Sequence, residues 1–181
     1  MSKNRKTDIR KLTVTAMMIA LSIVFERLLP IVDTRELRLS LGNVPIALTS
    51  IAVSPVYGAV CGVVADLIGC FIKGYPPYPF LMLAPLVVGF LPYYGIKLFG
   101  KLACDRKYGI VSVSATMIVT NVIASLFITT MGLAEMYGTS FYAQLVLRFP
   151  TIIAGTVFDV AVIYLLVRSG VIIKILSNGG K

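Results

Sequence analysis

Long apolar runs separated by short polar stretches dominate this chain. The runs extend approximately over residues 12–29, 44–72, 80–103, 110–133 and 145–167. A helix needs about 20 residues to cross the hydrocarbon core of a bilayer, and most of these runs reach that length. The pattern therefore predicts an all-α integral membrane protein with one transmembrane domain over residues 1–181 and no room for a soluble domain.

The second run is longer than one span needs and shorter than two full spans need. It is interrupted at Ser54-Pro55, where proline disfavours helix in the preceding residue. A helix of about ten residues covers only roughly 15 Å, so we expect the first half to pack among its neighbours. Splitting the run gives six predicted spans, approximately 12–29, 44–53, 56–72, 80–103, 110–133 and 145–167.

The placement of charge supports six spans over five. The net charge is +9, and basic residues are enriched in cytoplasmic loops of membrane proteins. Six spans put both termini and the middle basic cluster in the cytoplasm, as expected for a multi-pass, prokaryotic-type cell membrane protein. The positive charge is then explained without a nucleic-acid partner. The basic residues beside the runs are Lys3, Arg5, Lys6, Arg10 and Lys11, then Lys97, Lys101, Arg106 and Lys107, then Arg168, Lys174 and Lys181.

Residues suited to catalysis or metal binding are scarce. The chain has no histidine, and its cysteines, Cys61, Cys70 and Cys104, lie in or at the ends of apolar runs, so we expect neither disulfides nor metal sites. The segment GIKLFGKL nearly forms a phosphate-binding loop, but Leu102 stands where a magnesium-binding hydroxyl is required. We expect no cofactor, no catalytic residues and no ATPase activity, so the chain is not predicted to be an enzyme.

Asp66 is the most informative polar residue, because a carboxylate inside a span is costly and usually faces a partner or a water-filled cavity. Gly58, Gly62 and Asp66 are spaced four apart and share one helix face, where glycines permit close helix contact. Contact with a ligand and a structural link to an arginine or to the backbone are equally open for Asp66.

Three other polar residues lie inside the later spans. Arg148 is predicted just inside the outward end of the last span, where it either reaches the headgroups or points into a pocket, and we favour the pocket. Asn121 lies in the middle of the fifth span. An amide there favours an interhelical link over a ligand contact. Asp159, deeper in the last span, is assigned to structure.

The outward loops are rich in aromatic residues. Tyrosine is common at membrane interfaces in any case, but the segment KGYPPYPF is more specific, because its prolines fix the backbone and stiffen a loop that could hold a flat ligand. On the first helix, the small residues Ala16 and Ala20 share a face that another helix could approach closely. The outward aromatic residues are Tyr75, Tyr78, Phe80, Tyr137, Phe141 and Tyr142.

Four segments of this chain resemble the S components of energy-coupling factor (ECF) transporters, particularly the folate-specific members. The resemblance implies six helices with cytoplasmic termini and a vitamin pocket near the outer face. It also implies a transmembrane coupling protein that contacts the Ala-x-x-x-Ala face and carries two ATPases. Two departures are Ser54-Pro55 in place of Gly-Pro, and YPPYPFLML in place of Tyr-Phe-Pro-Gly-Phe-Thr-Leu. The segments are Ala16-x-x-x-Ala20, RLSLGNVPIAL, SPVYGAVCGVVADLIG and KGYPPYPF.

The resemblance leads to the hypothesis of high-affinity folate capture for ATP-driven uptake. Folate carries two carboxylates that arginine can clamp and a flat pterin that aromatic rings can cover. The alternatives are pantothenate or another vitamin, and a membrane scaffold without transport. Five basic residues are not cytoplasmic in this topology: Arg27, Arg35, Arg38, Lys73 and Arg148. The predicted contacts are Arg38 and Arg148 for the tail, Tyr75, Tyr78 and Phe80 for the ring, and Asp66 or Asn121 for pterin hydrogen bonds.

Overall fold

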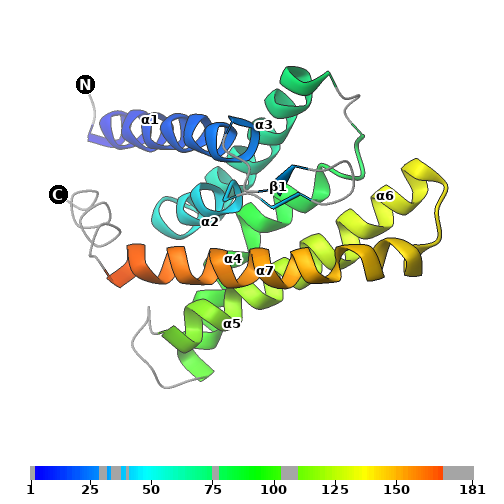
Figure 1. Ribbon diagram of the computed structural model, residues 1–181. Helices are drawn as coiled ribbons and strands as arrows, with labels where there is room; N and C mark the ends of the chain where they lie inside the picture. The colour runs from blue at the N-terminus through cyan, green and yellow to red at the C-terminus, as the bar shows by residue number, and fades with distance from the viewer. Residues whose placement is uncertain are drawn as a thin grey trace.

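The computed structural model describes residues 3–28, 32–33, 38–39, 41–74, 78–102 and 110–168, and helices make up most of them (Figure 1). The elements, in chain order, are α1 (Lys3–Ile23), the π-helix η1 (Val24–Leu28), β1 (Val32–Asp33), β2 (Arg38–Leu39), α2 (Asn43–Ala52), α3 (Pro55–Lys73), α4 (Leu83–Leu102), α5 (Ile110–Asn121), the π-helix η2 (Val122–Thr129), α6 (Thr130–Tyr137) and α7 (Phe141–Arg168).

The helical prediction is confirmed, with one addition. Two strands of two residues each, β1 and β2, pair antiparallel, with Val32 opposite Leu39 and Asp33 opposite Arg38. Strand β2 lies against α7, and Figure 1 shows the hairpin beside the end of α2 in the middle of the view. The segment before α2 therefore folds back over the bundle.

Four helical stretches among the described residues are long and apolar enough to cross a membrane, namely Pro55–Lys73, Leu83–Lys101, Val111–Met136 and Arg148–Leu166. The third combines α5, η2 and α6, which continue one another without a break. The start of α1 and the end of α7 lie on the same side of Figure 1, away from the turn between α6 and α7. The full count of six spans and the orientation of the termini stay predictions.

The predicted division of the second apolar run is present in the structure. Ser54 is extended, with φ −175° and ψ 152°, and Pro55 is the first residue of α3, a position where its missing N–H costs no helical hydrogen bond. The short helix α2 packs among its neighbours as expected, since every residue from Val44 to Ile51 is buried.

The core is built around α2, which contributes to both of its hydrophobic clusters. One cluster joins α2 to α4, α5 and α7 around Met117 and Ile163. The other joins α2 to α3, α4 and η2 around Cys61 and Val88. The glycine face of α3 brings it against α4 as predicted, because a Cβ on Gly58 would collide with the Gly89 carbonyl oxygen.

Candidate functional site

One face of α7 carries a row of polar side chains directed into the bundle. Gln144, Arg148, Thr151 and Asp159 fall within a narrow arc at 3.6 residues per turn, and each is buried or half-buried. The outer face of the same helix is apolar and exposed, with side chains such as that of Val157. Helix α7 therefore places its apolar side on the outside of the bundle and its polar side inward. We call these four residues the α7 polar row.

At one end of the row, three helices meet through polar side chains. Asn121, at the end of α5, donates a hydrogen bond from Nδ2 to Asp159 Oδ2 at 3.1 Å. The side chain of Asn43, the first residue of α2, lies beside the Asp159 carboxyl group. Asp159 is 2% exposed and Asn121 3%. The predicted interhelical role of Asn121 is thus confirmed, and Asp159 is its partner.

The same pair leaves hydrogen-bonding capacity unused. Asn121 Oδ1 and Asp159 Oδ1 are both buried and have no hydrogen-bond partner among the described residues. A buried acceptor without a donor costs about 1–3 kcal/mol, and such atoms in a native fold call for an explanation. Each of these two oxygens can accept an N–H donor from a bound molecule.

The other end of the row has the opposite character. Arg148 Nη1 and Thr151 Oγ1 are buried and lack a hydrogen-bond partner within the described part of the chain. They lie one turn apart on the face they share with Asp159, and the eleven residues from Arg148 to Asp159 span about 16 Å along the helix. The row thus offers a cationic donor at one end and acceptors at the other.

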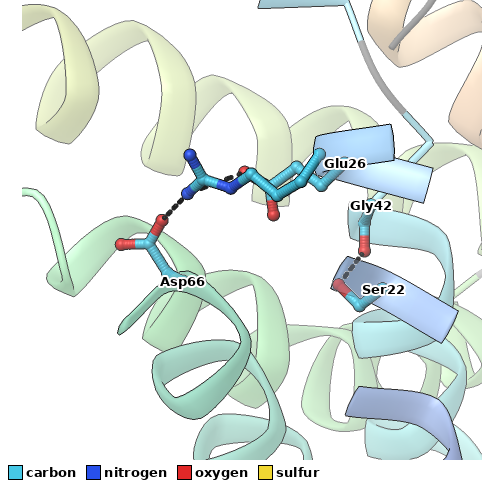
Figure 2. A network of polar contacts seen from close by, with 5 residues as sticks. Ser22, Glu26, Gly42 and Asp66 are labelled. Carbon is cyan, nitrogen blue, oxygen red and sulfur yellow. Dashed lines mark hydrogen bonds and ion pairs between the residues drawn. The ribbon is translucent and has the colours of Figure 1, made fainter. Parts of the chain in front are cut away.

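Asp66 lies in a different polar cluster, on α3. Arg27, in η1, donates from Nη2 to Asp66 Oδ1 at 3.1 Å, and the same nitrogen is 3.6 Å from Glu26 Oε1. The Arg27 side chain is 2% exposed. Gly69 leaves it room, because a Cβ there would collide with the guanidinium. We call Glu26, Arg27 and Asp66 the Arg27 cluster (Figure 2).

The Arg27 cluster is tied to the segment that follows the hairpin. Ser22 donates a hydrogen bond to the Gly42 carbonyl oxygen at 2.9 Å, one turn before Glu26 on the same helical run (Figure 2). Of the two roles that the sequence left open for Asp66, these contacts match the structural link to an arginine. They join the end of the first helix to α3 and to the start of α2.

The aromatic segment before α4 packs against α6. The phenol of Tyr78 hydrogen-bonds to Glu135, and the loss of hydration together with this carboxylate raises the pKa of Tyr78. Phe80 lies over Gly132, where a Cβ would come within 3.0 Å of its ring. Both contacts fix the segment to α6. The Tyr75 prediction falls outside the described residues.

Two further predictions concern Arg38 and the pair Ala16 and Ala20. The backbone of Arg38 belongs to β2, which lies against α7, while its side chain is outside the described part. Ala16 and Ala20 are exposed on α1, so their face is open to another helix.

Among the described residues, no group of histidine, cysteine, aspartate and glutamate side chains could hold a metal ion.

Sequence reasoning missed Gln144, Thr151 and Asn43 as members of the polar sites. The first two could have been found, because Gln144, Arg148 and Thr151 repeat at helical spacing within an apolar run. Asn43 could not, since its contact with Asp159 depends on how α2 packs against α7.

Comparison with known proteins places the chain in a family. The family described as "ECF transporter, substrate-specific component" matches residues 10–167, which is most of the sequence. This chain belongs to that family. It is therefore a membrane-embedded S component that binds the substrate of a transporter, and it is not an enzyme. A search of curated proteins found no match.

Two solved structures of S components share the fold. FolT bound with folic acid aligns with a TM-score of 0.72 and 20% sequence identity, over 86% of this chain and 92% of FolT. ThiT from Listeria monocytogenes aligns with a TM-score of 0.71 and 17% identity, over 93% of this chain and 98% of ThiT. At these identities the likeness establishes the fold of this S component.

Proposed function

We propose that this S component captures folate at the outer face of the cell membrane. The observation that supports this proposal is that the two ends of the α7 polar row differ. The unpaired Arg148 Nη1 lies at one end, and the unpaired oxygens of Asn121 and Asp159 lie at the other. The resemblance of the sequence to folate-specific members supports the same substrate. The fold does not choose between substrates, because folate-bound FolT and ThiT align with this chain about equally well.

The two ends of folate are chemically complementary to the two ends of the α7 polar row. Its pterin carries an amino group and a ring N–H, which pair with two neighbouring acceptor oxygens, and its glutamate tail carries two carboxylates. In this arrangement Asn121 and Asp159 accept hydrogen bonds from the pterin, and Arg148 binds a tail carboxylate through two parallel N–H bonds. Thr151 adds a hydroxyl one turn from the guanidinium. The aminobenzoyl group then lies along α7 between them.

The remaining predicted contacts surround this pose. Arg38, in the strand that lies against α7, is the second candidate for the tail carboxylates. Tyr75, Tyr78 and Phe80 belong to the segment that we propose covers the ring. For Asp66, the ion pair with Arg27 favours a role in holding the fold over a contact with the pterin.

Pantothenate is the alternative ligand because it also carries a carboxylate for Arg148. It is shorter than folate and has no aromatic ring, so it uses one end of the row and leaves the acceptor pair at Asp159 unfilled. We therefore expect weaker binding of pantothenate than of folate.

A pair of ligands tests the pose. 6-Hydroxymethylpterin is the ring end of folate and has no carboxylate, so titration calorimetry in detergent with folate, 6-hydroxymethylpterin and pantothenate separates the two ends of the site. Replacing Arg148→Met removes a charged hydrogen bond of about 1.5–3 kcal/mol, which lowers folate affinity roughly 10–150-fold and leaves the affinity for 6-hydroxymethylpterin unchanged. Asp159→Asn lowers the affinity for both ligands.

Two results would overturn the proposal. Tight binding of another vitamin, with no heat from folate at micromolar protein, removes folate as the substrate. Equal losses of folate and 6-hydroxymethylpterin affinity in Arg148→Met remove the assignment of the tail to this arginine. Retained helical circular dichroism and a monodisperse elution profile show that each variant is folded.

We also propose that transport energy comes from partner subunits, namely a transmembrane coupling protein and two ATPases. In this arrangement the chain crosses the membrane six times with both termini in the cytoplasm, and the coupling protein packs against Ala16 and Ala20. Copurification of the complex tests the interface. Ala16→Trp with Ala20→Trp abolishes it, whereas Ala161→Trp, on the exposed side of α7, leaves it intact. Unchanged assembly of the double variant would reject this face as the interface.

A further inference from the structure

An open groove of about 450 Å³ lies between α4 and α5, and no residue of the α7 polar row is among the described residues that line it. Its floor is formed where the helices approach most closely, since a Cβ on Gly95 would come within 2.5 Å of Thr116 Cγ2. The Thr116 hydroxyl is used within its own helix, donating to the Ser112 carbonyl oxygen at 2.7 Å. The floor therefore offers a methyl group and not a free hydroxyl.

The walls of this groove face the bilayer. Tyr94, Leu98 and Val119 line it and are between 40% and 58% exposed. All three lie in stretches long and apolar enough to cross a membrane. Hydrocarbon, and not water, is then the medium at the opening, so a lipid acyl chain is the molecule that meets these walls.

One end of the groove is strongly basic. Lys97 and Lys101 line it as well, are exposed and lie one helical turn apart near the end of α4. Among the described residues that line the groove, none is acidic. Lysine side chains near the end of a spanning helix extend to the headgroup level, so both ammonium groups can reach one phosphate.

We infer that this groove binds an anionic phospholipid, with one acyl chain between α4 and α5 and the phosphate held by Lys97 and Lys101. Basic pockets between transmembrane helices bind anionic headgroups, and each lysine near a membrane surface contributes about fivefold to that preference. A zwitterionic lipid has the same acyl chains but no net charge, so the two lysines favour the anionic lipid.

The absence of tryptophan from the chain permits a direct test. Phe99 lines the groove, and Phe99→Trp places the only tryptophan of the chain there, where it can be excited selectively over the tyrosines. Phe158→Trp, on the lipid-facing side of α7 where Phe158 is 47% exposed, is the matched control. Each variant is reconstituted in vesicles of phosphatidylcholine and phosphatidylglycerol in which only one of the two lipids is brominated.

The expected result is a difference between the two positions. Brominated phosphatidylglycerol quenches the tryptophan at position 99 more strongly than its mole fraction in the vesicle predicts. It quenches the tryptophan at position 158 in proportion to that mole fraction. Adding Lys97→Gln and Lys101→Gln to Phe99→Trp returns the quenching to the mole fraction. Adding Arg10→Gln and Lys11→Gln, which removes the same charge from α1, does not.

Two outcomes would overturn the inference. Equal quenching at positions 99 and 158 shows that the groove is not a lipid site. Equal quenching at position 99 by the two brominated lipids shows a groove that takes acyl chains without regard to headgroup charge. Folate binding by the Lys97→Gln/Lys101→Gln variant is expected to be unchanged, so this test is independent of the α7 polar row.

Discussion

Arg27 and Arg148 are both arginines held inside the helical bundle, and their surroundings differ in one respect. Arg27 has two carboxylates within 4 Å, those of Glu26 and Asp66. Neither Arg148 nor Asp159, the charges of the α7 polar row, takes part in an ion pair among the described residues. A buried charge with its counter-charge inside the protein serves the fold, whereas one without it is available for a ligand.

The largest expected effect comes from breaking the Arg27 cluster. Asp66→Leu leaves the Arg27 guanidinium, 2% exposed, beside Glu26 alone. Removing one partner of a buried pair costs about 3–5 kcal/mol, so the melting temperature in detergent should fall sharply and folate binding should fall with it. Thermal unfolding followed by circular dichroism measures the loss.

A charge-free cluster provides the control. Replacing Glu26→Gln, Arg27→Met and Asp66→Leu together removes every charge of the Arg27 cluster, and such exchanges are often neutral, so most of the stability and the folate binding return. If Asp66→Leu alone is fully stable but no longer binds folate, the assignment of Asp66 to structure is wrong and it belongs to the ligand site.

Arg148→Met should behave in the opposite way. Because Arg148 makes no ion pair in the described structure, removing its charge leaves the ligand-free melting temperature unchanged or raises it. The loss is confined to ligand-induced stabilisation, which falls with folate affinity according to mass action. A melting scan with and without saturating folate measures both quantities in one experiment.

A drop in ligand-free stability as large as that of Asp66→Leu would contradict the comparison, since Arg148 would then have a structural partner. Arg148→Lys is the matched variant. It keeps the charge but loses the two-pronged geometry of the guanidinium, so its folate affinity should lie between those of the wild type and Arg148→Met.

A smaller effect is expected from Gly69→Ala, which introduces a Cβ where the Arg27 guanidinium lies. Overpacking of this kind costs about 1–3 kcal/mol, because Arg27 must shift away from Asp66. In the charge-free triple variant, the flexible methionine at position 27 leaves the space open, and the cost disappears. If Gly69→Ala lowered the stability of the wild type and of the charge-free triple variant equally, Gly69 would be required for a reason other than room for Arg27.

Much of the fold follows from local patterns in the sequence. The apolar runs predicted helices, Ser54-Pro55 predicted where the second run divides, and the spacing of Gly58 and Gly62 predicted close contact between α3 and a neighbour. Each rests on a rule that acts within one helix or one turn. The two-residue strands β1 and β2 are too short to produce an alternating pattern, so no such rule reveals them.

The sites could be predicted only in part, because they depend on contacts between distant residues. Asp66 and Arg27 are 39 residues apart, and the sequence showed that Asp66 needs a partner without showing which. The π-helical segment η2, which directly follows Asn121, changes the number of residues per turn. A face counted at 3.6 residues per turn is therefore out of phase beyond it. The site around Asp159 was out of reach for a different reason, because its contacts with Asn43 and Asn121 depend on how α2 and α5 pack against α7.

The smallest expected effect concerns Tyr78, whose phenol hydrogen-bonds to Glu135. Tyr78→Phe removes this bond and lowers the melting temperature at neutral pH by less than Gly69→Ala does. Because the pKa of Tyr78 is raised in the folded state, its contribution is complete below the ordinary tyrosine pKa of about 10. It is lost as the pH rises through the raised value. Melting temperatures of the wild type and Tyr78→Phe should therefore converge in alkaline solution.

The control is Tyr142→Phe, since Tyr142 is 78% exposed and should melt like the wild type at every pH. A constant difference between the wild type and Tyr78→Phe across the titration would mean that packing of the ring, and not the bond to Glu135, holds this segment to α6. Folate affinity adds a second readout, because a segment that covers the ligand should release it faster once its attachment to α6 is weakened. If Tyr78→Phe melts at a lower temperature but releases folate at an unchanged rate, Tyr78 stabilises the fold without contributing to the ligand site. Arg27 and Arg148 divide these two roles in the same way within the bundle.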